Sequence, residues 1–252
     1  MQIKPKWPGY WLDLLLIAAA TLLLLIFVLH TSLQLTGGVL GAPLDDAWIH
    51  FQFARNLSQG QGFSYNPGEP TPGSTAPLWT LLLAAVGLFT EDFLVPSLVL
   101  SALFLLVAAW LAYGLVREVT GARWPGLLAG LVVAATGRLL WAGLAGMETT
   151  AFAALSLAAV WAYMRWGLRP FPVLLFALAA QMRPEGHALF ALAVLDTAVN
   201  HLLVTKTWRE WLRQTAVAGL LYGLVAAPYA LFSLATTGYP LPNTFYAKAS
   251  TT

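Results

Sequence analysis

The stretch that decides the fold lies near the N-terminus, where residues 11–35 read WLDLLLIAAATLLLLIFVLHTSLQL with a single acidic residue and no Lys or Arg. A bilayer core about 30 Å thick requires about 20 apolar residues in a helix that rises 1.5 Å per residue. Lys4 and Lys6 precede this stretch, which is about twice as long as the apolar core of a signal peptide. We therefore expect an uncleaved membrane anchor with its N-terminus inside the cell.

The rest of the chain is apolar in the same way. Of its 252 residues 59% are hydrophobic and only 10% are charged, whereas about 25% of an average soluble domain is charged. Further apolar runs bring the number of expected membrane spans to about seven, which makes one all-α transmembrane module of residues 1–252. These runs are Leu94–Val116, Trp124–Trp141, Thr149–Met164, Pro170–Met182, His187–Val204 and Thr215–Thr236.

The charged residues fix an orientation for these spans. If the spans cross alternately, the basic residues that flank them all fall on the side of Lys4 and Lys6, as the positive-inside rule requires. The long loop 36–93, the joints 146–149 and 183–186 and the tail 238–252 then lie outside. We expect the apolar run Pro77–Phe89, which is of intermediate length, to form a re-entrant or interfacial helix in that loop.

The overall charge and the absence of cysteine exclude several classes of function. Thirteen Lys and Arg residues against 11 Asp and Glu residues give a net charge of +2, too few and too scattered for a nucleic-acid surface. Without cysteine there is no disulfide, no thiolate nucleophile and no zinc site built on thiolates. We expect membrane lipid, and no nucleic acid, among the partners.

An acidic pair, Asp45 and Asp46, begins a segment with apolar residues at helical spacing (47–57), which predicts an amphipathic helix on the outer surface. One Asp is enough to cap such a helix. Two adjacent carboxylates at the mouth of a membrane cavity also suit a general base or a divalent cation such as Mg²⁺ or Mn²⁺. Both interpretations stay open, and Asp45 and Asp46 are the metal ligands if a metal is bound.

Two more charged residues belong to the same outer loop. Arg55 lies about three turns along the predicted helix, and Glu69 lies in a loop (58–75) rich in Gly, Pro and aromatic residues. Such a loop lines a groove or is an ordinary solvated loop, and the pattern does not separate the two.

The remaining polar candidates lie at the other outer joints and in the tail. Glu148 begins a span, where it caps the helix or binds a substrate. Arg183 and Glu185 form an interfacial ion pair or, alternatively, Arg183 binds a phosphate with its planar fork of donors. Tyr246 and Lys248 lie in an outer segment with two prolines, which excludes a helix interior there.

Several blocks of residues occur in a fixed order along the chain: DDAWI (45–49) with FARNL (53–57), GFSYNPGE (62–69), TAPLWTLLL (75–83), GMET (146–149), RPEG (183–186) and PNTFYAK (242–248). In this order and spacing the chain resembles the bacterial arabinofuranosyltransferase-like branch of the GT-C glycosyltransferases. The resemblance covers nearly the whole chain. It identifies the branch of the superfamily but not the sugar.

The resemblance implies a cell-membrane enzyme with a seven-helix module, and it assigns roles to the candidate residues. The enzyme would transfer a sugar from a polyprenyl-phosphate carrier to a glycan, lipid or protein hydroxyl on the extracytoplasmic face. Asp45 would be the general base, and Asp46 would orient it or hold a cation. The phosphate and the sugar would be bound by the other candidates: Arg55, Glu69, Glu148, Arg183, Glu185, Tyr246 and Lys248.

Members of the branch generally continue into further membrane helices, whereas this chain stops four residues after Lys248. The resemblance therefore implies that the C-terminal part of the architecture is absent. A non-catalytic or incomplete subunit is one alternative function. A transporter is another, for which Asp196 in mid-span would be the relevant residue, although the two-fold internal symmetry typical of transporters is not evident.

Overall fold

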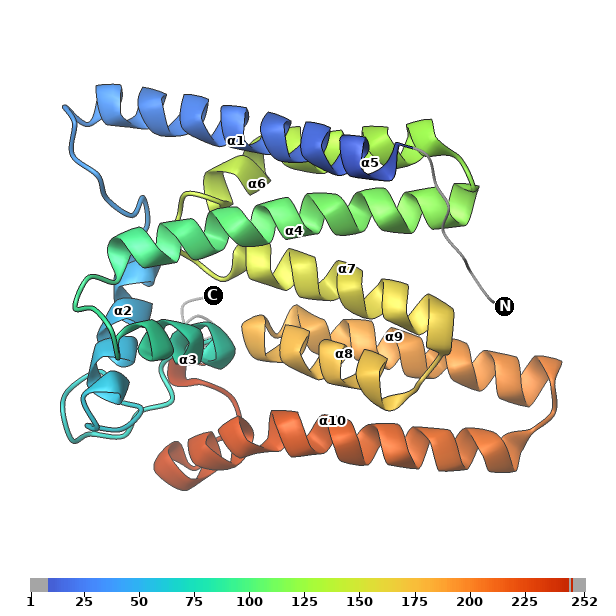
Figure 1. Ribbon diagram of the computed structural model, residues 1–252. Coiled ribbons are helices and arrows are strands. Elements are labelled where there is room, and N and C mark those ends of the chain that lie inside the picture. The colour runs from blue at the N-terminus through green and yellow to red at the C-terminus, as the bar shows by residue number, and fades with distance from the viewer. Residues whose placement is uncertain (1–8, 245, 247–252) are drawn as a thin grey trace.

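The computed structural model describes residues 9–244 and residue 246, and every regular element within them is a helix (Figure 1). A single isolated bridge between Ser64 and Pro70 is the only β-type pairing in the described residues. The helices are α1 (Tyr10–Leu35), α2 (Asp45–Ser58), α3 (Pro77–Val86), α4 (Leu94–Thr120), α5 (Arg123–Ala135), α6 (Gly137–Ala142), α7 (Thr149–Trp166), α8 (Pro170–Met182), α9 (Glu185–Val199), the π-helix η1 (Asn200–Val204) and α10 (Trp208–Thr237).

Four stretches of helix are long and apolar enough to cross a membrane: α1, α4, the continuous stretch α9–η1, and α10. Their outward faces carry bare apolar side chains; Leu15, Leu23 and Phe27 of α1 are each about two-thirds exposed. Soluble proteins rarely expose many large apolar side chains side by side, whereas helices that face lipid do. The expectation of an all-α chain with several helices of membrane-spanning length is confirmed.

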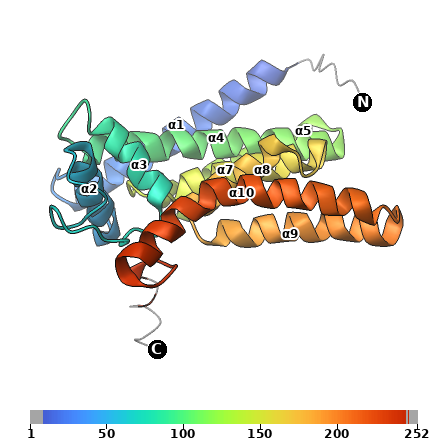
Figure 2. The ribbon, with the colours of Figure 1, turned by 90° about the horizontal axis from the view of Figure 1, so that it is seen from below.

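The long helices pack side by side into one bundle, and the short helices α2 and α3 close one end of it (Figures 1 and 2). The joints α6–α7 and α8–α9 lie at this closed end, whereas the joints α4–α5, α7–α8 and α9–α10 lie at the opposite end. Helix α4 contacts α1, α5 and α7, and α8 contacts α7, α9 and α10. The joints between helices therefore lie at two opposite ends of the bundle, and α2 and α3 cover only one of these ends.

Small residues let neighbouring helices approach closely. A Cβ atom built on Gly130 of α5 would lie 2.6 Å from Ile17 Cδ1 of α1 and 3.1 Å from the Ala109 carbonyl oxygen of α4. A side chain at this position would require the Ile17 side chain to move and would crowd the Ala109 carbonyl oxygen. The segment 126–130 therefore packs helices together through small residues, as its sequence predicts.

Buried ion pairs join the helices at the end opposite α2. Asp13 of α1 is fully buried and accepts hydrogen bonds from Arg123 Nη2 at 2.7 Å and from Tyr113 Oη at 3.0 Å, and it pairs with Arg117 Nη1 at 3.4 Å. A buried carboxylate is tolerable only when cations and donors surround it. Asp13 therefore ties α1 to α4 and α5.

The predicted span Trp124–Trp141 is divided into two helices, α5 and α6. The backbone at Thr136 is extended, with ψ at 114°, and separates α5 from α6. The Thr136 carbonyl oxygen accepts hydrogen bonds from the amides of Leu139 and Leu140, both at 2.9 Å, and so starts α6. By contrast, α8 has the predicted bounds, because Pro170 is well placed in a first helical turn and Pro184 disfavours helical backbone at Arg183.

Candidate functional site

A polar cavity of about 140 Å³ lies at the closed end of the bundle, where α2, the segment before α3 and the joints leading into α7 and α9 meet (Figure 1). Its lining mixes carboxylate, guanidinium, imidazole and hydroxyl groups with few apolar side chains. The lining residues are Asp46, Ile49, His50, Gly73, Ser74, Thr75, Met147, Glu148, Arg183 and Thr244.

An ion-pair network joins the two helical joints of this cavity. Arg183 Nη1 donates to Glu148 Oε1 at 2.9 Å, and Arg183 Nη2 donates to Glu185 Oε1 at 3.0 Å. Glu148 is 3% exposed, whereas the side chain of Glu185 is 59% exposed. Arg183 therefore bridges one buried and one solvent-facing carboxylate. The interfacial ion pair expected from the sequence is present, and Glu148 makes no side-chain cap on α7.

Glycines allow both joints to fold tightly. Gly146 adopts a positive φ of +70°, and its carbonyl oxygen accepts a hydrogen bond from Trp79 Nε1 at 3.2 Å. A Cβ atom on Gly186 would lie 2.4 Å from the backbone nitrogen of Ala180, so the start of α9 touches the backbone of α8. These contacts place Glu148 and Arg183 opposite each other.

One oxygen of Glu148 is left without a hydrogen bond. Glu148 Oε2 is buried and has no hydrogen-bond partner, and His50 Nε2 lies 3.6 Å from it. Burial raises the pKa of Glu148, and the charge of Arg183 opposes this rise. Thr244 Oγ1, which also belongs to the lining, is a second buried oxygen without a partner. Because buried polar atoms are almost always paired, the cavity is suited to a ligand that carries hydroxyl groups.

A histidine that the sequence reasoning missed lies between Glu148 and two hydroxyl groups. His50 Nδ1 lies 3.2 Å from Thr80 Oγ1 and 3.3 Å from Ser74 Oγ, and these two hydroxyls are 3.1 Å apart. Burial lowers the pKa of His50 to about 4, although the charge of Asp46 opposes this. The imidazole is therefore neutral at pH 7. His50 lies four residues after Asp46 and therefore on the same face of the predicted helix. This spacing is the sequence signal that points to His50 as a site residue.

The two residues of the acidic pair have different surroundings. Asp46 is half-buried and belongs to the cavity lining, whereas Asp45 is exposed and lies outside that lining. Asp45 Oδ1 accepts a hydrogen bond from the backbone amide of Asp46 at 3.0 Å. Both residues lie in the first turn of α2, so Asp45 accepts one of the free backbone N–H groups of that turn. Of the pair, Asp46 is thus the one placed to meet a ligand in the cavity.

Three other residues singled out from the sequence, Arg55, Glu69 and Tyr246, do not belong to the cavity lining. Arg55 is exposed and its guanidinium lies over the Phe93 ring, 5.8 Å from its centroid. Glu69 is exposed and accepts a hydrogen bond from Asn66 at 3.1 Å within its own loop. The Tyr246 ring packs 4.9 Å from the ring of Tyr239. Lys248 lies outside the described residues.

An apolar cavity of about 390 Å³ adjoins the polar one. It lies between α8 and α10, and both cavities are lined by Thr75. Pro184 and His187, which follow Arg183 closely in the sequence, line the apolar cavity. His187 Nδ1 lies 2.5 Å from the Tyr222 hydroxyl. Tyr229, which also lines it, donates a hydrogen bond to the Ser74 carbonyl oxygen at 2.6 Å. A polar compartment and an apolar one therefore meet at Thr75.

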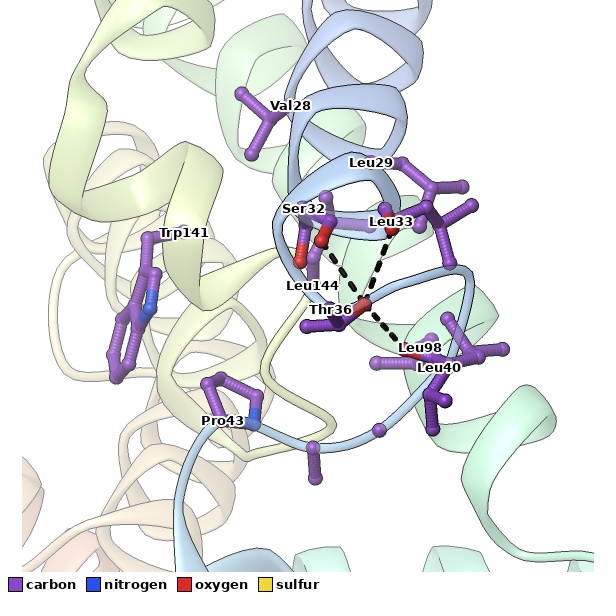
Figure 3. Close-up of a pocket in the computed structure, with 13 residues that line it drawn as sticks. Val28, Leu29, Ser32, Leu33, Thr36, Leu40, Pro43, Leu98, Trp141 and Leu144 are labelled. Atoms are coloured by element: carbon purple, nitrogen blue, oxygen red, sulfur yellow. Dashed lines mark hydrogen bonds between the residues drawn. The ribbon is translucent and has the colours of Figure 1, made fainter.

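A third cavity, of about 300 Å³, lies on the other side of the acidic pair, at the end of α1 (Figure 3). Leu29 and Leu33 of α1 line one side of it and Trp141 lines another. The Thr36 hydroxyl donates back to the Ser32 carbonyl oxygen at 3.1 Å, so its polar group is already paired. This cavity shares no lining residue with the polar one and holds none of the candidate site residues.

The described residues contain no preformed cluster of metal ligands. Within residues 9–244 and 246, no group of three His, Asp or Glu side chains is arranged to hold a metal ion. Glu148, the buried carboxylate, is already paired with Arg183. A cation at Asp45 and Asp46 would therefore have these two carboxylates as its protein ligands, and water and substrate phosphate would supply the others, as is usual for Mg²⁺.

Asp196, the mid-span carboxylate, packs two helices together. Its Oδ2 accepts a hydrogen bond from the Tyr163 hydroxyl of α7 at 2.6 Å. The same hydroxyl lies 2.9 Å from Thr197 Oγ1. These bonds connect α7 with α9 and give Asp196 a structural role.

No protein-family model, no curated protein and no solved structure matches this chain.

Proposed function

We propose that this protein is a membrane glycosyltransferase that transfers a sugar from a polyprenyl-phosphate donor to an acceptor hydroxyl on the extracytoplasmic face. The observation that carries the proposal is the junction at Thr75 of a carboxylate-lined polar cavity with an apolar cavity. A lipid-linked sugar has the same two parts, a hydroxyl-rich head and a hydrocarbon chain. The reaction class itself comes from the resemblance of the motif blocks to GT-C glycosyltransferases.

Each part of such a donor has a counterpart in the site. The hydrocarbon chain fits the cavity between α8 and α10, and sugar hydroxyls would donate to the unpaired Glu148 Oε2. Arg183 donates one N–H group to the buried Glu148 and two to the exposed Glu185, and the two N–H groups on Glu185 can be exchanged for a phosphate oxygen. On this proposal the phosphate lies at the boundary between the two cavities.

The reaction then needs one base and one group that stabilises the leaving phosphate. The Asp46 carboxylate takes the proton of the acceptor hydroxyl, whose oxygen forms a bond to the anomeric carbon. The bond from that carbon to the phosphate oxygen breaks, and the lipid phosphate leaves with the electron pair, next to Arg183. Direct displacement inverts the anomeric centre. We assign the base to Asp46 rather than to Asp45 because Asp46 lines the cavity, and no step is assigned to a cation.

The seven-span module of the GT-C family is part of the same proposal. It requires α5 with α6, α7 and α8 to cross the membrane in addition to the four longer stretches. The joints α4–α5, α7–α8 and α9–α10, which share one end of the bundle, carry most of the basic residues and would face the cytoplasm with the N-terminus (Figure 1). The candidate site would then open on the outer face of the cell membrane.

A transfer assay tests the proposal. The purified chain in proteoliposomes is given radiolabelled polyprenyl-phosphate sugars and an acceptor extract, with and without EDTA. We expect Asp46→Asn to reduce transfer about 10²–10⁴-fold, the usual contribution of a general base, with donor binding unchanged. Asp45→Asn should retain most of the transfer. Glu91→Gln is the matched control, because Glu91 is exposed near the same end and lies outside the cavity.

The outcomes separate the alternatives. Full transfer by Asp46→Asn would remove Asp46 from the role of base, and loss of transfer by Asp45→Asn alone would return that role to Asp45. Donor binding without transfer by the wild-type chain would favour a non-catalytic or incomplete subunit. Movement of the donor across the bilayer without transfer would favour a transporter.

A further inference from the structure

A second polar cavity lies at the end of the bundle opposite α2, between the α7–α8 turn and the first turns of α10 (Figure 1). Its volume is about 560 Å³. Arg169 lines it from the α7–α8 turn, and Arg213 and Gln214 line it from α10. Nothing in the proposed sugar transfer uses this cavity.

The two arginines of this cavity differ from three other arginines at the same end of the bundle. Arg117 and Arg123 pair with Asp13, and Arg165 pairs with Glu118. Within the described part of the chain, neither Arg169 nor Arg213 has a carboxylate within ion-pair distance. The cavity thus holds two cations whose charge is not neutralised by ion pairing.

A single carboxylate, Glu210, also lines the cavity. Its Oε1 accepts a hydrogen bond from Gln214 Nε2 at 3.3 Å. Two guanidinium groups against one carboxylate leave the lining with a net positive charge. An anionic ligand therefore suits it, and guanidinium forks favour phosphate.

The position of the cavity relative to the membrane indicates the source of that phosphate. Helix α7 runs from Thr149 beside the candidate site to Trp166 in this lining. Its 18 residues span about 27 Å, close to the thickness of a bilayer core. Trp166 is 47% exposed, as aromatic residues at a membrane interface commonly are.

Apolar side chains border the two arginines on the outer surface. Phe171 of α8 is 55% exposed, and Leu212 and Val217 of α10 are 47% and 50% exposed. A phosphate that carries acyl chains would place those chains against these residues. We propose that this cavity binds the headgroup of an anionic phospholipid, with Arg169 and Arg213 holding its phosphate. Basic pockets between membrane helices are suited to such headgroups.

Native mass spectrometry of the full chain in neutral detergent tests this inference. Phosphatidylglycerol is titrated against phosphatidylcholine with the same acyl chains and against water-soluble glycerol 3-phosphate. Each arginine near a lipid phosphate contributes about fivefold in affinity, so Arg169→Gln with Arg213→Gln should weaken phosphatidylglycerol binding about 30-fold. Arg209→Gln is the matched control, because Arg209 is on α10 at the same end but outside the lining.

Several results would overturn the inference. These are unchanged phosphatidylglycerol binding in the double variant, equal binding of both phospholipids, an equally large effect of Arg209→Gln, or binding of glycerol 3-phosphate as tight as that of the lipid. If the double variant does not fold, the pair Arg169→Lys and Arg213→Lys should retain binding, and each single Gln variant should lose about fivefold. The inference does not depend on sugar transfer and stands if transfer is absent.

Discussion

Replacement of Arg183 by Gln should destabilise the protein by an amount that depends on pH. The change leaves Glu148, which is 3% exposed, without its cation. Removing one partner of a fully buried ion pair costs about 3–5 kcal/mol. Because the Arg183 side chain is 35% exposed, solvent already screens part of this pair. We therefore expect a loss of about 2 kcal/mol at pH 7.5.

The sign of the pH dependence follows from Glu148. Burial raises the pKa of this carboxyl above its ordinary value of 4.5, and Arg183 lowers it. Without Arg183 the pKa of Glu148 rises further in the folded state. A carboxyl that binds its proton more tightly when folded loses stability as the pH rises from the unfolded pKa through the folded one. The deficit of Arg183→Gln should thus be smallest near pH 4.5 and largest above the folded pKa.

Denaturant unfolding in mixed micelles, followed by far-UV circular dichroism from pH 4.5 to 8, measures this deficit. The matched background is Glu148→Gln, which removes the carboxylate but retains its volume. In that background Arg183→Gln should cost much less above the folded pKa of Glu148, because no buried charge is left unpaired. A deficit that is constant with pH, or that is as large in the Glu148→Gln background, would refute the reasoning.

Two further predictions concern neighbours of this pair. Burial lowers the pKa of His50 from 6.5 to about 4, so the wild type should lose about 3 kcal/mol of stability as the pH falls from 6.5 to 4. His50→Gln should lack this loss in the same unfolding experiment, and parallel pH curves would contradict it. Gly186→Ala should cost about 3 kcal/mol, because its Cβ would lie 2.4 Å from the Ala180 nitrogen. Gly223→Ala is its control, with no atom within 4 Å of the new Cβ, and equal effects of the two changes on thermal unfolding would disprove the close contact.

The sequence predicts helices well where apolar runs end at strong local signals. Proline supplies such a signal on both sides of α8, and its observed bounds are the predicted ones. The break at Thr136 lacks a proline and has only Gly137 beside it, a residue that helices tolerate. The local sequence therefore does not predict the extended backbone at Thr136.

Part of the candidate site is likewise readable from the sequence. The motif blocks contain Asp46, Glu148 and Arg183, and the structure brings these three residues to one cavity from helices far apart in the chain. Which member of the acidic pair faces the cavity depends on the rotation of α2, since successive helical residues point about 100° apart. That rotation is set by packing against α3 and is not encoded in the DDAWI block itself.

On the proposed function, the net charge of the site determines how the donor phosphate can bind. Asp46, Glu148 and Glu185 outnumber Arg183, so a phosphate that simply joined this set would meet an excess of negative charge. The two carboxylates on Arg183 are not equivalent, however. Glu185 is 59% exposed and forms a screened, weak pair, whereas Glu148 is buried and cannot give up its cation at low cost. On the proposed function, the phosphate therefore displaces Glu185 from Arg183, while Glu148 stays in place and accepts a sugar hydroxyl at Oε2.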